Sequence, residues 1–509
     1  MKPQYSGMAR SRREAVDGVS YREIAQPMDI PFLYNKAAAA PRRVDIAALL
    51  IILLHAAALV LFVVKPLEGA VLFCVGLTVA VALGRPLPIL LVSLALLWVN
   101  DPLADLYPLS QYTAWKDVLL LVVFIGWMLR SLVLRRPVVL DSPISRPLLL
   151  LVIAFLVGCI NSPSMTHAVL GLKACVFYSV WYFVLPEIIR SKRDARALVM
   201  AVLFGTVCLS FYNFWAVQQP AYGIFPAGRD GRVLPGALMV HWSPSSSFLP
   251  PGILFGMVIA PRLRMWRRIL VNIAVVIGVG GLVVTSGRAA WGILLITTLI
   301  LSALGRRAGL TRILLVAVIV AGVIQTQMSL DVTERAASAF ESNDVSADAR
   351  EAEFTTVTLP FVLSHPFGAG TGSMSAQGSA KVWAGGSDVD FVLQKGIIHN
   401  GFLLVAIEIG WVGLAAYIWM LIAAMAASWR AYKKARDPFV KDLALSCLGI
   451  VFFFTAMNFA LSILTTALIG YDIWVFLGLI TLLPRLDDEA TNAAGRLASS
   501  VAPEPVACR

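Results

Sequence analysis

The sequence predicts an all-α, polytopic membrane protein with about 12–14 transmembrane helices and one large loop outside the membrane. Hydrophobic residues make up 59% of the 509 residues and charged residues only 14%, which is more apolar surface than a soluble chain could bury. The apolar residues form repeated runs of roughly 14–23 residues, a length typical of membrane-spanning helices rather than of barrel strands. Arg and Lys concentrate in alternate links between these runs, as they do in proteins that cross a membrane many times.

Five regions follow from this pattern. Residues 1–44 are polar, and we expect them to form a cytoplasmic tail without a cleavable signal peptide. Transmembrane helices are expected over residues 45–327 and 399–484, separated by a large periplasmic loop at 328–398. Residues 485–509 are expected to form a disordered cytoplasmic tail. The apolar runs lie near residues 45–64, 67–84, 87–100, 117–134, 147–160, 168–189, 195–217, 248–261, 266–284, 289–304, 311–327, 399–427, 441–461 and 467–483.

The positions of the charges predict the orientation. The net charge of +12 comes from short basic links, not from one basic face, so nucleic-acid binding is excluded. Cations are scarce in the intervening links, and 101–117, 161–167 and 462–470 contain none or are acidic. Because basic links stay in the cytoplasm, both termini are predicted to be cytoplasmic. The basic links contain Arg85; Arg130, Arg135, Arg136 and Arg146; Arg190, Lys192, Arg193 and Arg196; Arg262, Arg264, Arg267 and Arg268; Arg306, Arg307 and Arg312; and Arg430, Lys433, Lys434, Arg436 and Lys441.

The large loop has its own predicted structure. It carries nine acidic residues against four Lys and Arg and is too long for a simple connector, which favours a partly helical, functional lid. The stretches 336–340 and 349–363 have helical character. Residues His365 to Gly372, His-Pro-Phe-Gly-Ala-Gly-Thr-Gly, form a cluster of helix breakers that must turn sharply.

Four cations on the periplasmic side are candidate phosphate ligands. Arg229 and Arg232 lie in the outer loop 218–247, and Arg288 lies in a Ser-Gly-Arg turn between two apolar runs. Lys173 lies inside an apolar run, where a charge usually has a partner or a task. Converging arginines suit a lipid-linked pyrophosphate, because guanidinium groups bind phosphate oxygens in a bidentate manner. The alternative is that these side chains reach to the membrane surface or pair with acidic residues of the loops.

A titratable histidine lies where the large loop meets the next apolar run. His399 could accept a proton from a sugar hydroxyl, or could merely cap or border the helix. Asn400 is expected to cap that helix, and Gly410 and Gly413 to allow close helix packing. Glu408 is expected to be paired inside the bundle, on the opposite side of a straight helix from His399. Attack of a sugar hydroxyl with departure of a lipid pyrophosphate requires no metal or cofactor. No metal-ligand cluster is found in the sequence.

Three segments resemble the bacterial O-antigen ligase and polysaccharide polymerase superfamily. They are the His-Asn pair followed by nine residues and Gly-x-x-Gly (His399–Gly413), the turn Ser286–Trp291, and the cluster His365–Gly372. The resemblance covers roughly residues 200–485, in the order of the family's motifs. It implies a GT-C-like, multi-helix glycosyltransferase of the bacterial inner membrane that moves a glycan from undecaprenyl pyrophosphate to an acceptor hydroxyl without a metal. The family's catalytic histidine corresponds to His399, and its periplasmic arginines to Arg288 and Arg232.

Three functions compete on this basis. The first is a polysaccharide polymerase, which lengthens an undecaprenyl-pyrophosphate-linked glycan by repeat units, with membrane lipid around it and a flippase and a chain-length regulator as candidate partners. The second is a ligase, which transfers the finished glycan to lipid A–core or another acceptor. The third is a flippase or another transporter of lipid-linked oligosaccharides. Charges that gather at the outer rim rather than near the bilayer midplane favour catalysis over transport.

The predicted orientation is testable with enzyme fusions. An alkaline phosphatase fused at about Ser379 should be active, because the loop 328–398 is predicted to be periplasmic. A fusion at about Arg436 should be inactive. The reverse pattern of activities would contradict the orientation and the placement of the candidate site.

Overall fold

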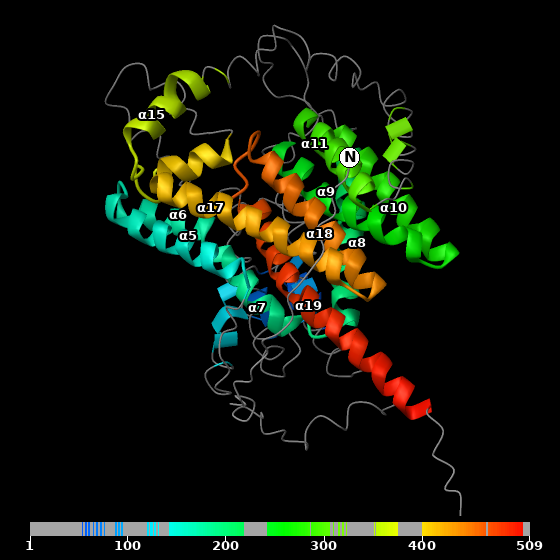
Figure 1. The fold of residues 1–509 in the computed structure, drawn as a ribbon. Coiled ribbons are helices and arrows are strands. Elements are labelled where there is room, and N and C mark those ends of the chain that lie inside the picture. The colour runs from blue at the N-terminus through cyan, green and yellow to red at the C-terminus, as the bar shows by residue number, and fades with distance from the viewer. Residues whose placement is uncertain are drawn as a thin grey trace, which may run out of the picture. The chain divides into compact units, whose positions relative to one another are not determined.

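The computed structural model describes residues 142–217, 242–285, 287–305, 353–374, 400–464 and 467–501, with residue 351 and isolated residues within 53–131 and 309–322. All regular elements in this part of the chain are helices (Figure 1). The elements are α5 (Ser145–Gly158), η2 (Cys159–Asn161), α6 (Met165–Cys175), η3 (Phe177–Ser179), α7 (Val180–Ile188), α8 (Lys192–Val217), α9 (Trp242–Ile259), η5 (Ala260–Arg262), α10 (Met265–Val284), α11 (Arg288–Gly305), the π-helix η6 (Glu353–Thr358), α15 (Leu359–Ser364), α17 (Gly401–Lys434), α18 (Pro438–Met457) and α19 (Ala467–Val501).

Several of these helices are long and apolar enough to cross a membrane. Six such spans occur among the described residues: Met165–Ile188, Lys192–Trp215, Met265–Val284, Arg288–Gly305, Gly401–Lys434 and Pro438–Met457. The predicted all-α, polytopic membrane class is therefore confirmed. The predicted runs 45–64, 67–84, 87–100, 117–134 and 311–327 fall largely outside the described residues.

The C-terminal helix is longer than its apolar run. We predicted a span ending near residue 483 and a disordered tail from 485, whereas α19 continues to Val501. The polar extension 484–501 contains four Ala, two Leu and two Arg, residue types with high helix propensity. Pro484 lies inside the helix without ending it. The boundary of the tail was placed too early because the prediction followed hydrophobicity alone.

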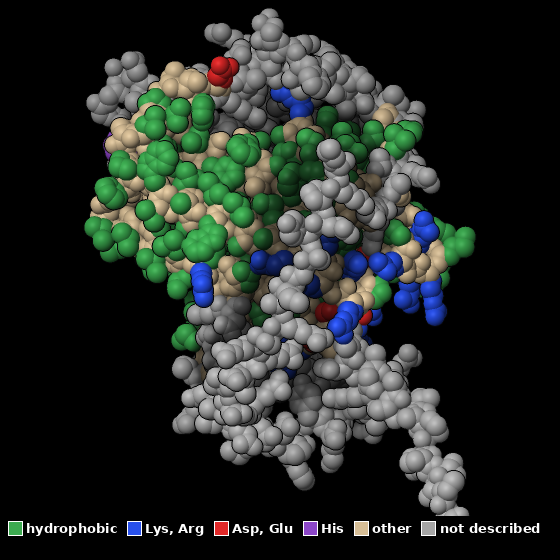
Figure 2. Space-filling view, in the orientation of Figure 1, with side chains coloured by type: hydrophobic (Ala, Val, Ile, Leu, Met, Phe, Trp, Pro, Cys, Tyr) green, Lys and Arg blue, Asp and Glu red, His purple; other side chains and the backbone are tan. Residues whose placement is uncertain are grey.

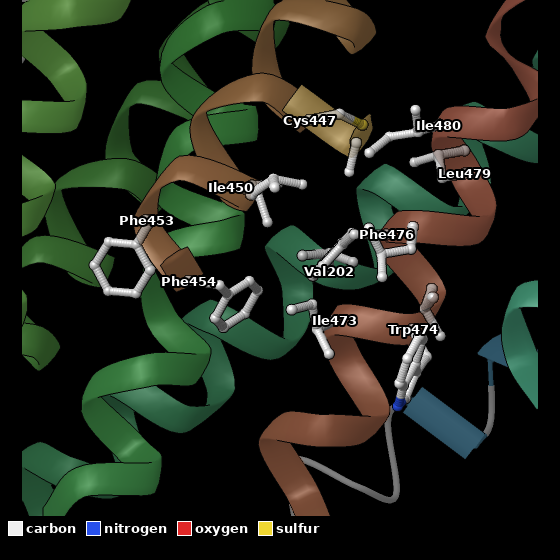
Figure 3. Packing of buried hydrophobic residues seen from close by; sticks show 14 of the residues in the cluster. Val202, Cys447, Ile450, Phe453, Phe454, Ile473, Trp474, Phe476, Leu479 and Ile480 are labelled. Atoms are coloured by element: carbon white, nitrogen blue, oxygen red, sulfur yellow. The ribbon is translucent and has the colours of Figure 1, made fainter. Parts of the chain in front are cut away.

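The core is formed around α18. This helix packs against α17, α9, α19 and α11, while α8, α9 and α10 pack against one another. Figure 3 shows the apolar side chains where α18 and α19 meet. The ring of Phe476 lies 5.8 Å from that of Phe255 and 6.3 Å from that of Phe454, between centroids. In a bilayer, packing of this kind must supply what the hydrophobic effect supplies in water.

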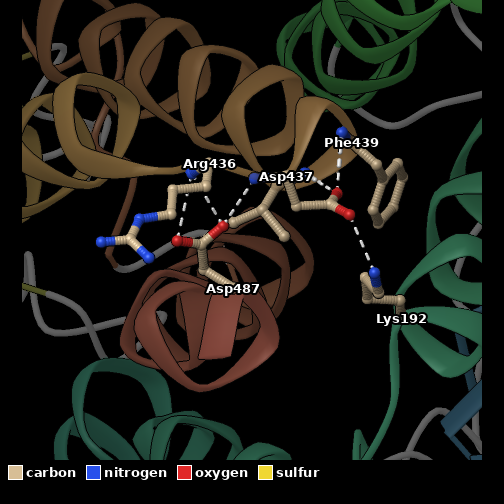
Figure 4. Close-up of polar contacts among 6 residues, drawn as sticks. Lys192, Arg436, Asp437, Phe439 and Asp487 are labelled. Carbon is tan, nitrogen blue, oxygen red and sulfur yellow. Dashed lines mark hydrogen bonds and ion pairs between the residues drawn. The ribbon is translucent and has the colours of Figure 1, made fainter. Parts of the chain in front are cut away.

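One end of the described bundle is held by ionic contacts. The ammonium of Lys192, at the start of α8, lies 2.8 Å from a carboxylate oxygen of Asp437. Asp437 also caps α18, accepting hydrogen bonds from the backbone N–H groups of Phe439 and Val440. Asp487 of α19 accepts from the backbone N–H groups of Arg436 and Asp437 (Figure 4). The link between α17 and α18 is thereby tied to both α8 and α19.

The ionisation of Asp437 follows from these contacts. Burial raises the pKa of its carboxyl, but hydrogen bonds from the Lys192 ammonium and two backbone N–H groups outweigh burial. The pKa therefore lies below its ordinary value, and Asp437 is ionised at neutral pH. The cap and the ion pair are both present under those conditions.

Two further contacts bring other basic links to the same end. Arg262, at the end of η5, forms an ion pair with the buried Asp442 of α18. Arg485 of α19 donates to the backbone carbonyls of Pro186 and Ile189, where α7 ends. Figure 2 shows most of the visible Lys and Arg side chains along one edge of the apolar surface. Links predicted to share a side of the membrane therefore lie together.

Candidate functional site

The opposite end of the bundle contains the start of α17. The side chain of Asn400 accepts hydrogen bonds from the backbone N–H groups of Phe402, at 3.0 Å, and Leu403, at 3.1 Å, which caps the helix. The backbone N–H of Gly401 donates to the carbonyl of Asn458 at 2.7 Å. A Cβ atom at position 401 would lie 2.2 Å from the Asn458 side-chain oxygen. The helix start is therefore pressed against the end of α18, and a side chain at position 401 would have to displace that of Asn458.

Asn458 is a site residue that the sequence analysis missed. Its buried side chain accepts a hydrogen bond from the Tyr417 hydroxyl at 3.1 Å and donates to the carbonyl of Phe454 at 2.8 Å. The ring of Phe402 lies against the rings of Tyr417 and Phe459. A polar amide inside the apolar run 441–461 was the available signal. His399 itself lies outside the described residues, directly before this fixed corner.

The helix that follows is broken at Gly410. This residue has φ 70° and ψ −168°, within a helix that otherwise runs from Gly401 to Lys434. We expected Gly410 and Gly413 to permit close helix packing; in the structure the nearest neighbours of both positions belong to the break. A Cβ atom at Gly410 would lie 2.2 Å from the Pro366 carbonyl oxygen, and one at Gly413 would meet the Ile409 side chain of the same helix. The glycines serve the break, not a helix–helix contact.

The backbone groups freed by the break are satisfied by residues 365–374, which we call the glycine-rich segment. In an unbroken helix the Trp411 N–H would bond to the Ile407 carbonyl. A backbone group without a partner would be costly inside a membrane. Three hydrogen bonds replace the helical ones: Trp411 N–H to the Pro366 carbonyl at 2.9 Å, Ala369 N–H to the Ile407 carbonyl at 2.6 Å, and Gly370 N–H to the Glu408 carbonyl at 3.0 Å.

The glycine-rich segment turns as predicted. Gly368, Gly370 and Gly372 have φ values of 75°, 102° and 83°, a region that residues with a side chain rarely adopt. A Cβ atom at Gly372 would lie 1.8 Å from the His167 carbonyl oxygen. The helical character predicted for 349–363 is also confirmed, because η6 and α15 occupy Glu353–Ser364. The stretch 336–340 lies outside the described residues.

Helices α5 and α6 hold the other side of the glycine-rich segment. The buried Thr371 donates through its hydroxyl to the Phe155 carbonyl at 2.5 Å and through its N–H to the Gly158 carbonyl at 3.0 Å. A Cβ atom at Gly158 would lie 2.6 Å from the Thr371 hydroxyl oxygen, and one at Gly171 would lie 2.4 Å from the Gly372 nitrogen. Glycines in two apolar runs thus make room for the segment, a signal that the sequence analysis did not use.

Glu408 lies at the centre of these contacts. It is fully buried. One carboxylate oxygen accepts from the Met374 backbone N–H at 3.3 Å, and the other lies 3.9 Å from the Cys175 sulfur of α6. The carboxylate is thus enclosed by the bundle and connects α17 to the glycine-rich segment and to α6.

Arg288 begins α11 and is half-buried. The turn before it is fixed, because the Thr285 hydroxyl and the Trp291 indole N–H both donate to the Leu282 carbonyl. Gly287 lies against Ser246 near the start of α9, whereas α9 leads at its other end to Arg262 and the ion pair with α18. Arg288 is therefore at the end opposite to the ionic contacts.

That end is shared with the start of α17. Near the start of α18, Asp442 lies beside Arg262, and Asn458, directly after the end of α18, lies beside Gly401. Since α11 packs against α18 and α9, the turn carrying Arg288 and the corner at Asn400 belong to the same end of the bundle. The structure therefore brings together the ends that carry these two predicted site residues.

The other predicted cations are placed differently. Lys173 lies in the last turn of α6 with an exposed side chain, while Gly171 and Cys175 on the same helix are buried. It is thus on the face of α6 that does not contact the glycine-rich segment. Arg229 and Arg232 lie outside the described residues. Among the described residues, no three His, Cys, Asp or Glu side chains form a group that could hold a metal ion.

Comparison with known proteins bears on these placements. Residues 273–418 match the family model of O-antigen ligase, which supports the predicted resemblance to the O-antigen ligase and polysaccharide polymerase superfamily. The matched range contains Arg288, the glycine-rich segment, Asn400 and the helix break, whereas Lys173, Arg229 and Arg232 lie before it. A search among curated proteins returned no match to the chain.

The requirement for glycine at the helix break is testable. Gly410→Ala should lower the thermal stability of the detergent-solubilised protein. The backbone at φ 70° and ψ −168° is a region that is essentially restricted to glycine, so an alanine there costs about 1–3 kcal/mol, and its Cβ would overlap the Pro366 carbonyl oxygen. Gly292→Ala in α11 is the matched control, since a Cβ there meets no atom within 4 Å. Equal melting temperatures for the two variants would show that the break does not depend on glycine.

Proposed function

We propose that the chain is a polysaccharide polymerase of the bacterial inner membrane, on the premise that its match to the O-antigen ligase family model over residues 273–418 supports the O-antigen ligase and polysaccharide polymerase superfamily. It transfers undecaprenyl-pyrophosphate-linked glycan repeat units to an acceptor sugar hydroxyl at the periplasmic face. The observation that carries the proposal is that the matched range includes both Arg288 and the start of α17, and that the two lie at one end of the bundle.

The orientation of the proposed enzyme is supported by the ionic contacts. Basic links stay in the cytoplasm in most membrane proteins, and the links around Lys192, Arg262 and Arg436 are held together at one end. With that end in the cytoplasm, Arg288 and Asn400 face the periplasm. Both chain termini are then cytoplasmic, as the alternation of charges predicts.

Donor binding is assigned to Arg288, with Arg232, Arg229 and Lys173 as further candidates. The leaving group is a lipid pyrophosphate, which is already an anion and needs its charge neutralised as the glycosidic bond breaks. A half-buried guanidinium at the membrane boundary is suited to this task, because its planar donors match phosphate oxygens and the low dielectric strengthens the contact. The fixed turn before Arg288 reduces the cost of orienting its backbone.

His399 is assigned as the general base. Its neutral imidazole takes the proton of the acceptor hydroxyl while that oxygen attacks the anomeric carbon and the bond to the pyrophosphate oxygen breaks. The support from the structure is the fixed corner that follows it, where Asn400 caps α17 and Gly401 is held by Asn458. The residues that follow the base therefore have a fixed backbone position at the start of α17.

Ligation is the second candidate function, and the family match supports it as well as polymerisation. A ligase would use the same donor and the same base, but would transfer the finished glycan to lipid A–core or another acceptor. The two functions differ in product. Cells lacking the protein would accumulate single lipid-linked repeat units if it is a polymerase, and long lipid-linked glycans if it is a ligase.

The base is tested by two substitutions at His399. His399→Ala should lower the rate of glycan transfer by roughly 10²–10⁴-fold in membranes that contain normal amounts of the protein. His399→Gln should be nearly as impaired, because an amide hydrogen-bonds but does not accept a proton at neutral pH. His167→Ala is the matched control and should leave transfer unchanged, since the His167 imidazole contacts Ser164 at the start of α6. Full-length glycan from both His399 variants would refute the proposed mechanism.

The donor contact is tested at Arg288. Arg288→Lys keeps the charge but loses the bidentate fork. We therefore expect the rate of transfer to fall by roughly 10–100-fold, which corresponds to the loss of one hydrogen bond to a charged group. Arg264→Lys, an exposed residue at the ionic end of the bundle, should have no effect. Unchanged glycan yield from Arg288→Ala, at normal protein levels, would remove the residue from the donor site.

A further inference from the structure

Glu408 is a buried carboxylate in a helix that spans the membrane. It has no exposed surface, and ionisable groups in such a position are costly to insert and tend to serve function. The residue lies two positions before the break at Gly410, on the half of α17 that begins at Gly401. The proposed chemistry assigns it no step.

The residue holds the glycine-rich segment at two points. Its backbone carbonyl accepts from the Gly370 N–H at 3.0 Å. Its carboxylate accepts from the Met374 N–H at 3.3 Å. Between these points the segment closes a turn, because the Ser373 N–H donates to the Gly370 carbonyl at 3.2 Å. One residue of α17 therefore binds both ends of one turn in the loop.

We propose that Glu408 is a positioning residue for glycosyl transfer, in that it locks the turn 370–374 onto the outer half of α17. The proposal rests on the proposed function. The outer half of α17 is held at its start by Asn458 and Asn400 and at its end by the glycine-rich segment. With both ends fixed, the half-helix keeps one orientation next to the position from which His399 acts.

The contact requires a hydrogen-bond acceptor, not a negative charge. Glutamine has an acceptor oxygen at the same reach as glutamate, so Glu408→Gln should keep the turn in place and retain transfer within about twofold of the unsubstituted protein. Its pH profile should also be unchanged, because the proposed role involves no proton. Glu408→Ala leaves the Met374 N–H without this buried partner, and transfer should fall by about tenfold or more.

Cysteine labelling measures the position of the turn independently of activity. Ser373 is fully buried, so in purified protein Ser373→Cys should react slowly with a maleimide. These substitutions are made in a protein in which alanine replaces every native cysteine except Cys175. Labelling of that protein without Ser373→Cys gives the baseline rate. Adding Glu408→Ala should accelerate labelling of the cysteine at position 373 by about tenfold, and Glu408→Gln should not. The exposed Ser364→Cys, on the same loop, should label equally in all three proteins.

The outcomes separate the proposal from the function on which it rests. Slow labelling at position 373 in the Glu408→Ala protein would overturn the proposal. So would a Glu408→Gln protein that keeps the turn protected but loses activity as severely as Glu408→Ala, because the charge would then be required. If His399→Ala still produced full-length glycan while the labelling pattern held, the proposed function would fail, and the contact of Glu408 would remain without its catalytic role.

Discussion

Inside a membrane, every backbone N–H and carbonyl needs a partner within the protein. Helix α17 breaks at Gly410 in spite of this constraint, and the glycine-rich segment supplies the partners: the Pro366 carbonyl for one side of the break and the Ala369 and Gly370 N–H groups for the other. The conformation of the outer loop next to the bundle, the room made by Gly158 and Gly171, and the burial of Glu408 all follow from satisfying this one break.

The two ends of the described bundle are stabilised by different forces. One end is ionic, with Lys192 paired with Asp437 and Arg262 paired with Asp442. The other end is held mainly by backbone hydrogen bonds and amide groups, as at Gly401 and Asn458. The half-buried Arg288, which begins α11, lies at this second end.

The sequence predicted the features that depend on local composition. Hydrophobic runs indicated the helices, alternating cations indicated which links share an end, and three closely spaced glycines indicated the turn at 368–372. The break at Gly410 was missed because it depends on hydrogen bonds from residues some forty positions earlier, and nothing in an apolar run reports such partners. The role of Asn458 was missed for the same reason, since its contacts come from α17. The exposure of Lys173 was not predicted either, because it depends on which face of α6 packs inward.

The order of the two partners along the chain has a consequence for biogenesis. The glycine-rich segment is synthesised before α17, so it has already left the ribosome when Gly410 emerges. The half-helix can then receive its missing hydrogen bonds as it inserts. In the reverse order, the carbonyls of Ile407 and Glu408 would enter hydrocarbon before any partner existed, at a cost of several kcal/mol for each group. The arrangement along the chain thus lets the broken helix enter the bilayer without a period in which its backbone is unpaired.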